Sequence, residues 1–294
     1  MRVMIFGAGY SGQAIAADFL KAGADVAGTT RSEEKSQNLK DKAIRPFLFG
    51  GTELGDGLRT ELAQTTHLIQ SIAPAIAPGE GGDPLLNVIN GDVRAVFPKL
   101  QWVAYLSTVG VYGDHQGDWV DEETPCRPVS ARSRERVAAE NAWQAAANRA
   151  EVPLAILRLS GIYGPGRNGF ISLAQGTARR LVKPGQVFNR IRVEDIGRAT
   201  LFLCERHASG IFNVTDDLPA PPQDVVTEAA HLMGIQPPPE QAFETAELTP
   251  MARSFYGENK RVSNMKIRNL GFNFQFPTFE VSLEQLWQSG RWKA

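Results

Sequence analysis

The stretch that decides the fold is Met1-Arg2-Val3-Met4-Ile5-Phe6-Gly7-Ala8-Gly9-Tyr10-Ser11-Gly12. Its first half is a short apolar run that is typical of a buried strand, and its second half fits the pattern G-x-G-x-x-G. In such a loop Gly7 lets the chain turn sharply, Gly9 lets the backbone approach a pyrophosphate, and Gly12 lets a helix pack closely on the strand. The phosphates of a dinucleotide then meet the positive end of that helix. We therefore expect five residues to bind the dinucleotide: Gly7, Gly9, Tyr10, Ser11 and Gly12.

Apolar runs of strand length recur along the first half of the chain, with helical stretches between them. The runs are 3–6, 25–29, 45–49, 66–72, 102–107 and 154–159, and the helical stretches include 12–21, 87–97 and 130–150. This alternation predicts an α/β fold, a Rossmann-type doubly wound parallel sheet with helices on both faces.

The pattern changes after Gly161, where stretches rich in Gly and Pro separate short helices. We expect a smaller C-terminal α+β substrate lobe there. The domains expected are 1–160 for dinucleotide binding, with 195–214 returning to it, and 161–294 for a discontinuous substrate-binding lobe.

The end of the second predicted strand bears on which dinucleotide is bound. An NAD site needs an acidic residue about 20 residues after the glycine loop, to hold the ribose 2′-hydroxyl. This chain has Thr30, Arg31 and Ser32 there, so a planar guanidinium and two hydroxyls face the position of a 2′-phosphate. We predict NADP(H) over NAD(H), with Glu33 and Glu34 close enough to weaken the preference.

The composition of the chain excludes several classes of binding partner. The formal net charge is −1, which leaves no broad basic field for nucleic acid or an anionic membrane. No apolar run approaches the roughly 20 residues of a membrane helix. The chain has two cysteines and four scattered histidines, so we expect no metal and a reduced, cytoplasmic setting. A small-molecule substrate is the expected partner.

Further motifs stand in one order along nearly the whole chain. They are Leu106-Ser107-Thr108-Val109-Gly110-Val111-Tyr112-Gly113, Arg158-Leu159-Ser160-Gly161-Ile162-Tyr163-Gly164-Pro165-Gly166, Val193-Glu194-Asp195 and Gly210-Ile211-Phe212-Asn213-Val214. With the glycine loop, they resemble the extended short-chain dehydrogenase/reductases of the NAD(P)-dependent epimerase/dehydratase family. The resemblance implies a catalytic hydroxyl at Thr108, adenine and ribose contacts near Phe49, and cofactor contacts from Ser71 and Ala73.

The chain departs from this family at its Tyr-x-x-x-Lys motif. Aligned on Pro128 and Glu140, the Tyr position is Arg132 and the Lys position is Arg136. An arginine stays protonated in proteins and cannot give up a proton as an activated phenol does. Arg132 can instead hydrogen-bond a substrate oxygen and stabilise negative charge on it, and Arg136 can still meet the ribose hydroxyls.

Tyr163 or Tyr112 is a candidate to replace the lost proton donor. The alternative is that both tyrosines only pack the bases of their loops. His115 follows Tyr112 on a loop and is a further candidate, but an exposed loop histidine is the simpler interpretation. Arg158 and Arg167 either hold an anionic group of the substrate or serve as a structural ion pair and a solvated cation.

The function these residues predict is that of an NADP(H)-binding atypical short-chain dehydrogenase/reductase. The reaction would be oxidoreduction, or nucleotide-sugar epimerisation or dehydration with no net change of the cofactor, on a small oxygenated substrate. The alternative is a non-catalytic NADP(H)-sensing or scaffold protein. We expect a monomer or a homodimer. Small residues at helical spacing either form a dimer face or pack on the chain's own sheet: Ala138, Ala139, Ala142 and Ala146.

Overall fold

The computed structural model describes residues 1–74 and 82–293 and divides the chain into two compact units. Unit 1 comprises Met1–Val111, Pro128–Arg158 and Ile196–Phe212. Unit 2 comprises Tyr112–Arg127, Leu159–Asp195 and Asn213–Ala294. Residues 112–127, which we expected within the first domain, therefore group with the second unit.

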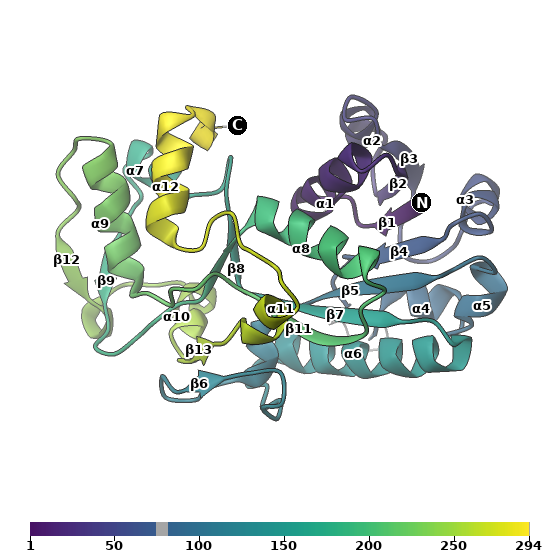
Figure 1. Cartoon of the computed structure of the whole chain (residues 1–294). Coiled ribbons are helices and arrows are strands. Elements are labelled where there is room, and N and C mark those ends of the chain that lie inside the picture. The colour runs from purple at the N-terminus through teal and green to yellow at the C-terminus, as the bar shows by residue number, and fades with distance from the viewer. Residues whose placement is uncertain (75–81, 294) are drawn as a thin grey trace. The chain divides into compact units, whose positions relative to one another are not determined.

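Unit 1 is built on a parallel sheet, which has seven strands within the described residues, in the order β3-β2-β1-β4-β5-β7-β11 (Figure 1). The chain builds outward from β1 to β3, then returns to the other side of β1 with β4. This is the doubly wound order, and it places a topological switch point between β1 and β4. The predicted fold class is confirmed. The strands are β1 (Arg2–Phe6), β2 (Asp25–Thr30), β3 (Arg45–Leu48), β4 (His67–Gln70), β5 (Trp102–Thr108), β7 (Leu154–Leu159) and β11 (Gly210–Val214).

Helices cover both faces of this sheet (Figure 1). On one face α1 packs so closely on α8 that a Cβ at Gly197 would lie 2.7 Å from the carbonyl oxygen of Ala14. On the other face Trp143 of α6 is fully buried and stacks on Tyr105, with ring centroids 6.3 Å apart. The helices are α1 (Tyr10–Lys21), α2 (Glu33–Lys40), α3 (Asp56–Leu62), α4 (Pro84–Val88), α5 (Val93–Val96), α6 (Ala131–Ala150) and α8 (Val193–Glu205).

Of two predicted helices, the structure confirms one and contradicts the other. The helix over 130–150 is confirmed as α6, and the hydroxyl of Ser130 accepts a hydrogen bond from the Ser133 amide at 3.1 Å, as a cap should. The single helix expected over 87–97 is wrong. Asn90 and Gly91 have φ values of +49° and +68°, so the chain leaves the right-handed region there and α4 and α5 are separate short helices.

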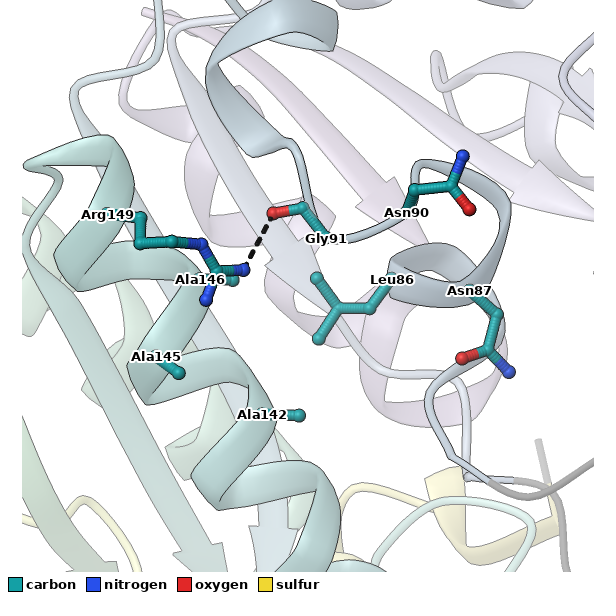
Figure 2. A pocket seen from close by; sticks show the side chains of 8 residues that line it. All are labelled: Leu86, Asn87, Asn90, Gly91, Ala142, Ala145, Ala146 and Arg149. Carbon is teal, nitrogen blue, oxygen red and sulfur yellow. Dashed lines mark hydrogen bonds between the residues drawn. The ribbon is translucent and has the colours of Figure 1, made fainter.

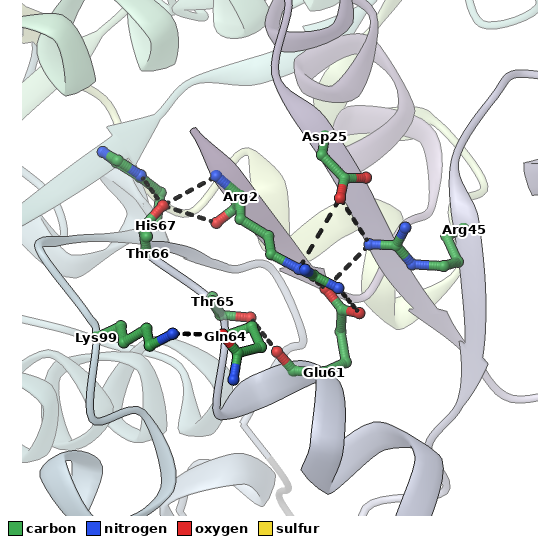
Figure 3. A network of polar contacts seen from close by, with 9 residues as sticks. All are labelled: Arg2, Asp25, Arg45, Glu61, Gln64, Thr65, Thr66, His67 and Lys99. Carbon is green, nitrogen blue, oxygen red and sulfur yellow. Dashed lines mark hydrogen bonds and ion pairs between the residues drawn. The ribbon is translucent and has the colours of Figure 1, made fainter.

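Charged side chains close the amino edge of the sheet in unit 1. Figure 3 shows Arg2 and Arg45 converging on Glu61, whose side chain is only 6% exposed. Arg2 donates to both carboxylate oxygens of Glu61 at 2.8 Å, and Arg45 donates to one of them at 3.0 Å. The hydrogen bond from Arg2 holds the pKa of Glu61 below its usual range. Ion pairs among these side chains occupy the amino edge, whereas ligands of doubly wound sheets bind outside the carboxyl ends of the strands.

Unit 2 has the mixed α+β character that the sequence predicts, with three two-stranded sheets among its described residues. One of its apolar clusters gathers around the fully buried Phe170, with Leu283 and Leu286 of α12. No helix in the described parts of the chain is long and apolar enough to cross a membrane. The elements of unit 2 are β6 (Trp119–Val120), β8 (Gly161–Tyr163), α7 (Gly169–Ala174), β9 (Arg180–Val182), β10 (Arg190–Arg192), α9 (Pro222–Leu232), β12 (Glu240–Ala242), α10 (Pro250–Phe255), β13 (Arg261–Val262), α11 (Met265–Asn269) and α12 (Phe279–Gln288).

Candidate functional site

The glycine loop connects β1 to α1, and two of its glycines are required by the protein itself. Gly7 has φ +84°, and a Cβ there would lie 2.9 Å from Cγ1 of Ile72. A Cβ on Gly12 would lie 2.8 Å from the carbonyl oxygen of Gly7 and 3.2 Å from Cγ2 of Ile5. Gly7 therefore permits the turn, and Gly12 permits close packing of the helix on the strand.

Gly9 differs from both of these glycines. Its φ of −82° suits any residue, and no described heavy atom lies within 4 Å of the Cβ that it lacks. Neither backbone strain nor internal packing therefore calls for glycine there. Gly9 is also the N-cap of α1, and no side chain caps that helix start, where Tyr10 is exposed and Ser11 half-buried. Bare backbone beside open amide groups fits the pyrophosphate of a dinucleotide.

Thr29, a residue that the sequence analysis missed, fastens the loop to β2. Its hydroxyl accepts a hydrogen bond from the Gly7 amide at 2.9 Å, and its carbonyl oxygen accepts one from the Ala8 amide at 2.9 Å. Thr29 is buried. The signal was available in the Thr29-Thr30 pair, but the partner of each hydroxyl follows only from the pairing of β1 with β2.

The three residues expected to select the dinucleotide follow directly along the chain. Thr30 ends β2 and is half-buried, Arg31 is exposed, and Ser32 occupies the N-cap position of α2. Arg31 makes no ion pair within the part of the chain that the structure describes. Glu33 and Glu34 form the first turn of α2 and are exposed.

The segment after β4 lies beside the glycine loop. The Ser71 amide donates to the carbonyl oxygen of Phe6 at 2.9 Å, and Ala73 is exposed. A buried pair missed by the sequence analysis supports this segment: the Gln70 side-chain amide donates to both carboxylate oxygens of Asp83 at 2.8 Å. Burial raises the pKa of Asp83.

Phe49, near which the adenine and ribose contacts are expected, packs in the core of unit 1. It is 3% exposed and meets Phe6 edge-to-face with centroids 5.1 Å apart.

Thr108 stands at the carboxyl end of β5 and is half-buried. Its hydroxyl oxygen accepts a hydrogen bond from the Gly110 amide at 3.2 Å, which leaves the hydroxyl proton able to donate. The Ser133 hydroxyl of α6 approaches the same turn, at 3.1 Å from the Cβ that Gly110 lacks. The start of α6 therefore lies against the turn that follows Thr108.

The two arginines expected at the Tyr and Lys positions, Arg132 and Arg136, differ in exposure and contacts. Arg136 is half-buried, and its Nη1 donates to the carbonyl oxygen of Leu106 at 2.8 Å and to the Tyr105 hydroxyl at 3.2 Å. Its guanidinium carbon lies 5.7 Å from the centre of the Tyr105 ring. Burial raises the pKa of Tyr105 to about 12, so this phenol stays neutral. Arg132, one turn earlier, is exposed.

Glu140, Arg158 and Ser107 form a buried polar cluster that joins α6, β7 and β5. Nε and Nη2 of Arg158 donate to the Glu140 carboxylate at 3.2 and 2.8 Å, and the Ser107 hydroxyl donates to the same carboxylate. Arg158 is 3% exposed. The structural alternative for Arg158 is therefore correct, because its guanidinium serves an internal ion pair.

Both candidate tyrosines belong to unit 2, whereas Thr108 and the two arginines belong to unit 1. Tyr112 is fully buried and its hydroxyl donates to Oδ1 of Asn213 at 2.7 Å, so it packs its loop. Tyr163 ends β8, and burial, with Asp216 nearby, raises the pKa of its phenol. Arg167 is exposed.

A shallow hollow of about 550 Å³ lies between α4 and α6 in unit 1 (Figure 2). Asn87, Ala142 and Arg149 are among its lining residues, and none of the expected site residues is. Of the small residues of α6, Ala139 and Ala146 pack in the core, while Ala138 and Ala142 are exposed. No group of three metal-ligating side chains occurs among residues 1–74 and 82–293.

Comparison with known proteins agrees with this architecture. Residues 84–215 match the family described as "NAD dependent epimerase/dehydratase family", a range that contains Thr108, Arg132 and Arg136 but not the glycine loop. A structure of a conserved protein of unknown function from Silicibacter pomeroyi DSS is 43% identical over 98% of this chain and 99% of its own, with a TM-score of 0.87. Residues 84–215 therefore form an NAD-dependent epimerase/dehydratase family domain. Solved structures of epimerases and dehydratases share the fold of this chain, and the matched family binds NAD(P).

More distant members of this fold carry either dinucleotide. The UDP-glucose 4-epimerase of Thermus thermophilus, in complex with NAD, is 20% identical over 98% of both chains, with a TM-score of 0.76. The human epimerase family protein SDR39U1, with NADPH, is 15% identical over 98% of this chain and 99% of its own, with a TM-score of 0.72. These two show the fold alone. No curated protein matches the sequence.

Proposed function

We propose that this chain binds NADP(H) and acts as an oxidoreductase or epimerase/dehydratase-like enzyme on a small oxygenated substrate. The observation that carries the proposal is Gly9, a glycine that the protein's own packing does not require and that leaves bare backbone at an uncapped helix start. The pyrophosphate would lie against the residues from Gly7 to Gly12, and Ser71 and Ala73 would line the rest of the dinucleotide.

The preference for NADP(H) rests on charge at the end of β2. Arg31 is exposed and unpaired within the described residues, and Thr30 and Ser32 flank it with hydroxyls. A guanidinium fork matches the oxygens of a phosphate, so these three residues would hold a 2′-phosphate. NAD(H) lacks that group and would bind more weakly.

The chemistry would take place beside Thr108. A bound nicotinamide supplies a hydride donor or acceptor, and the protein contributes binding, orientation and charge. The Thr108 hydroxyl would donate to a substrate oxygen, Arg136 would meet the ribose hydroxyls, and Arg132 would stabilise negative charge. Tyr163 remains the candidate for proton transfer, although its raised pKa keeps the phenol protonated near neutral pH.

Fluorescence titration with NADPH and NADH tests the cofactor assignment. We expect NADPH to bind more tightly, and Arg31→Gln to weaken NADPH by roughly 10- to 100-fold while leaving NADH unchanged, because one charge-assisted hydrogen-bonded pair is lost. Lys35→Gln, an exposed change on α2, serves as the control and should alter neither affinity. Equal affinity of the wild-type chain for both dinucleotides would contradict the assignment.

A second candidate is a non-catalytic NADP(H) sensor or scaffold. It is favoured by Arg132 and Arg136 standing where the family carries its Tyr and Lys. Incubation with aldehydes, ketones and sugar nucleotides, followed by both NADPH absorbance and product analysis, separates the two. Turnover that Thr108→Ala abolishes supports the enzyme, whereas tight NADPH binding without any product supports the sensor.

A further inference from the structure

The start of α6 carries more positive charge than its surroundings neutralise. Arg132, Arg134 and Arg136 occupy its first six residues, and its first turn contains no acidic residue. Arg134 is already engaged, because its Nη1 donates to the carbonyl oxygen of Val129 at 3.0 Å. Arg132 is exposed and makes no ion pair within the described residues. Glu135, three residues further along α6, forms no ion pair with Arg132 among the described residues, so the Arg132 guanidinium is not held in an internal salt bridge.

Arg136 also pairs with no carboxylate among the described residues, although one stands at the right spacing. Glu140 lies one helical turn further along α6, where the two side chains would ordinarily pair. Both Glu140 oxygens instead receive hydrogen bonds from Arg158, and Ser107 adds a third. Arg136 is left with two neutral acceptors on β5, and its Nε is buried without a hydrogen-bond partner in the described part of the chain.

The hydrogen bond from Arg136 to Leu106 fixes this face of α6 at the end of β5, two residues before Thr108. Arg132 follows the same helix face, since residues four apart project to the same side. We infer that Arg132 and Arg136 recognise an anionic oxygen group, a carboxylate or a phosphate, on the substrate whose neighbouring oxygen Thr108 contacts. This inference rests on the proposed function, because it names the substrate class of the same site.

The physical reason is geometric as well as electrostatic. A guanidinium presents parallel N–H donors that match the oxygens of a carboxylate or phosphate, and two cations bind an anion more tightly than a neutral analogue. A substrate with only hydroxyl and carbonyl groups would leave the Arg132 charge without a partner. The replacement of the family's Tyr and Lys would then be a change of substrate specificity.

The test uses the full-length protein saturated with NADPH and three probes of similar size: malonate, inorganic phosphate and the neutral malonamide. Isothermal titration should show saturable binding of malonate or phosphate, weakened by added KCl, and none of malonamide. Arg132→Gln should weaken the anion at least about tenfold. Arg134→Gln, two residues away and already bonded to Val129, should leave it unchanged. Malonate binding alone would identify a carboxylate site, and phosphate binding alone a phosphoryl site.

Two results would overturn the inference: anions that bind the wild-type chain no better than malonamide, or anions that bind Arg132→Gln as tightly as wild type. Arg132 is exposed, so this variant should retain the wild-type unfolding midpoint. The NADPH affinity of each protein is measured first. If wild type does not bind NADPH, the proposed function fails and this inference fails with it; if NADPH binds and the anions do not, the inference alone fails.

Discussion

Replacing Gly9 with alanine should separate dinucleotide binding from stability. The Cβ of alanine would meet no described atom within 4 Å, and φ −82° is open to alanine. Its cost at the N-cap of α1, about 0.5–1 kcal/mol, is offset by the lower entropy of the unfolded chain, about 0.4–1 kcal/mol. The free energy of unfolding should therefore change by less than about 0.5 kcal/mol. The same methyl group would occupy the space of the pyrophosphate, so we expect NADPH affinity to fall at least about tenfold, or roughly 1.4 kcal/mol.

Gly12→Ala is the matched control on the same loop. Its Cβ would stand 2.8 Å from the carbonyl oxygen of Gly7, a backbone atom that cannot move aside, and the overpacking should cost about 1–3 kcal/mol of stability. Urea unfolding gives the stability of each variant, and NADPH fluorescence titration gives its affinity. The reasoning is refuted if Gly9→Ala binds NADPH as wild type does, or if it loses as much stability as Gly12→Ala.

Three further predictions concern buried titratable side chains of unit 1. Burial lowers the pKa of His67 to about 4, so the unfolded chain binds more protons between pH 6.5 and 4, and stability should fall by roughly 3 kcal/mol as pH drops through that window. Urea midpoints of His67→Asn should lose this slope while those of the exposed His231→Asn keep it; an unchanged slope in the first variant contradicts the assignment. Glu140→Gln leaves Arg158 buried without its counter-charge and should cost about 3–5 kcal/mol by urea unfolding, and a loss below about 1 kcal/mol would argue against a buried pair. Glu61→Gln should cost about 1–3 kcal/mol near neutral pH. Because the folded pKa of Glu61 is lowered, its stabilisation is present above about pH 4.5 and is lost as pH falls further, so wild type and this variant should converge in acid; a gap that persists there would show that the charge is not responsible.

The sheet of unit 1 was predictable because parallel strands buried on both faces read as continuous apolar runs. The glycine loop was equally predictable, since the turn requires Gly7 and the close packing of the helix requires Gly12. The break between α4 and α5 was missed because a helical apolar pattern continues on both sides of it. Asn90-Gly91 carried the signal, since both residue types accept positive φ.

Contacts between side chains far apart in the sequence could not be predicted from the sequence. Thr29 holds the Gly7 amide, and Gln70 holds Asp83, only because the fold brings them together. The two interpretations of Arg158 could not be separated from its neighbours along the chain, since its partner, Glu140, lies on α6. Tyr112 was a candidate proton donor until Asn213 proved to accept its hydrogen bond.

The chain passes between the two units at 111/112, 127/128, 158/159, 195/196 and 212/213, and this interleaving constrains how the molecule is made. On the ribosome the first unit stays incomplete until residue 212 has emerged, because its edge strand β11 is synthesised last. A fragment that stops at residue 160 lacks that strand, and its Trp102 indole loses the Ala208 carbonyl that it donates to at 2.9 Å. Neither unit can be cut out of the gene as one uninterrupted stretch, so any exchange of the second unit between relatives has to preserve every junction together.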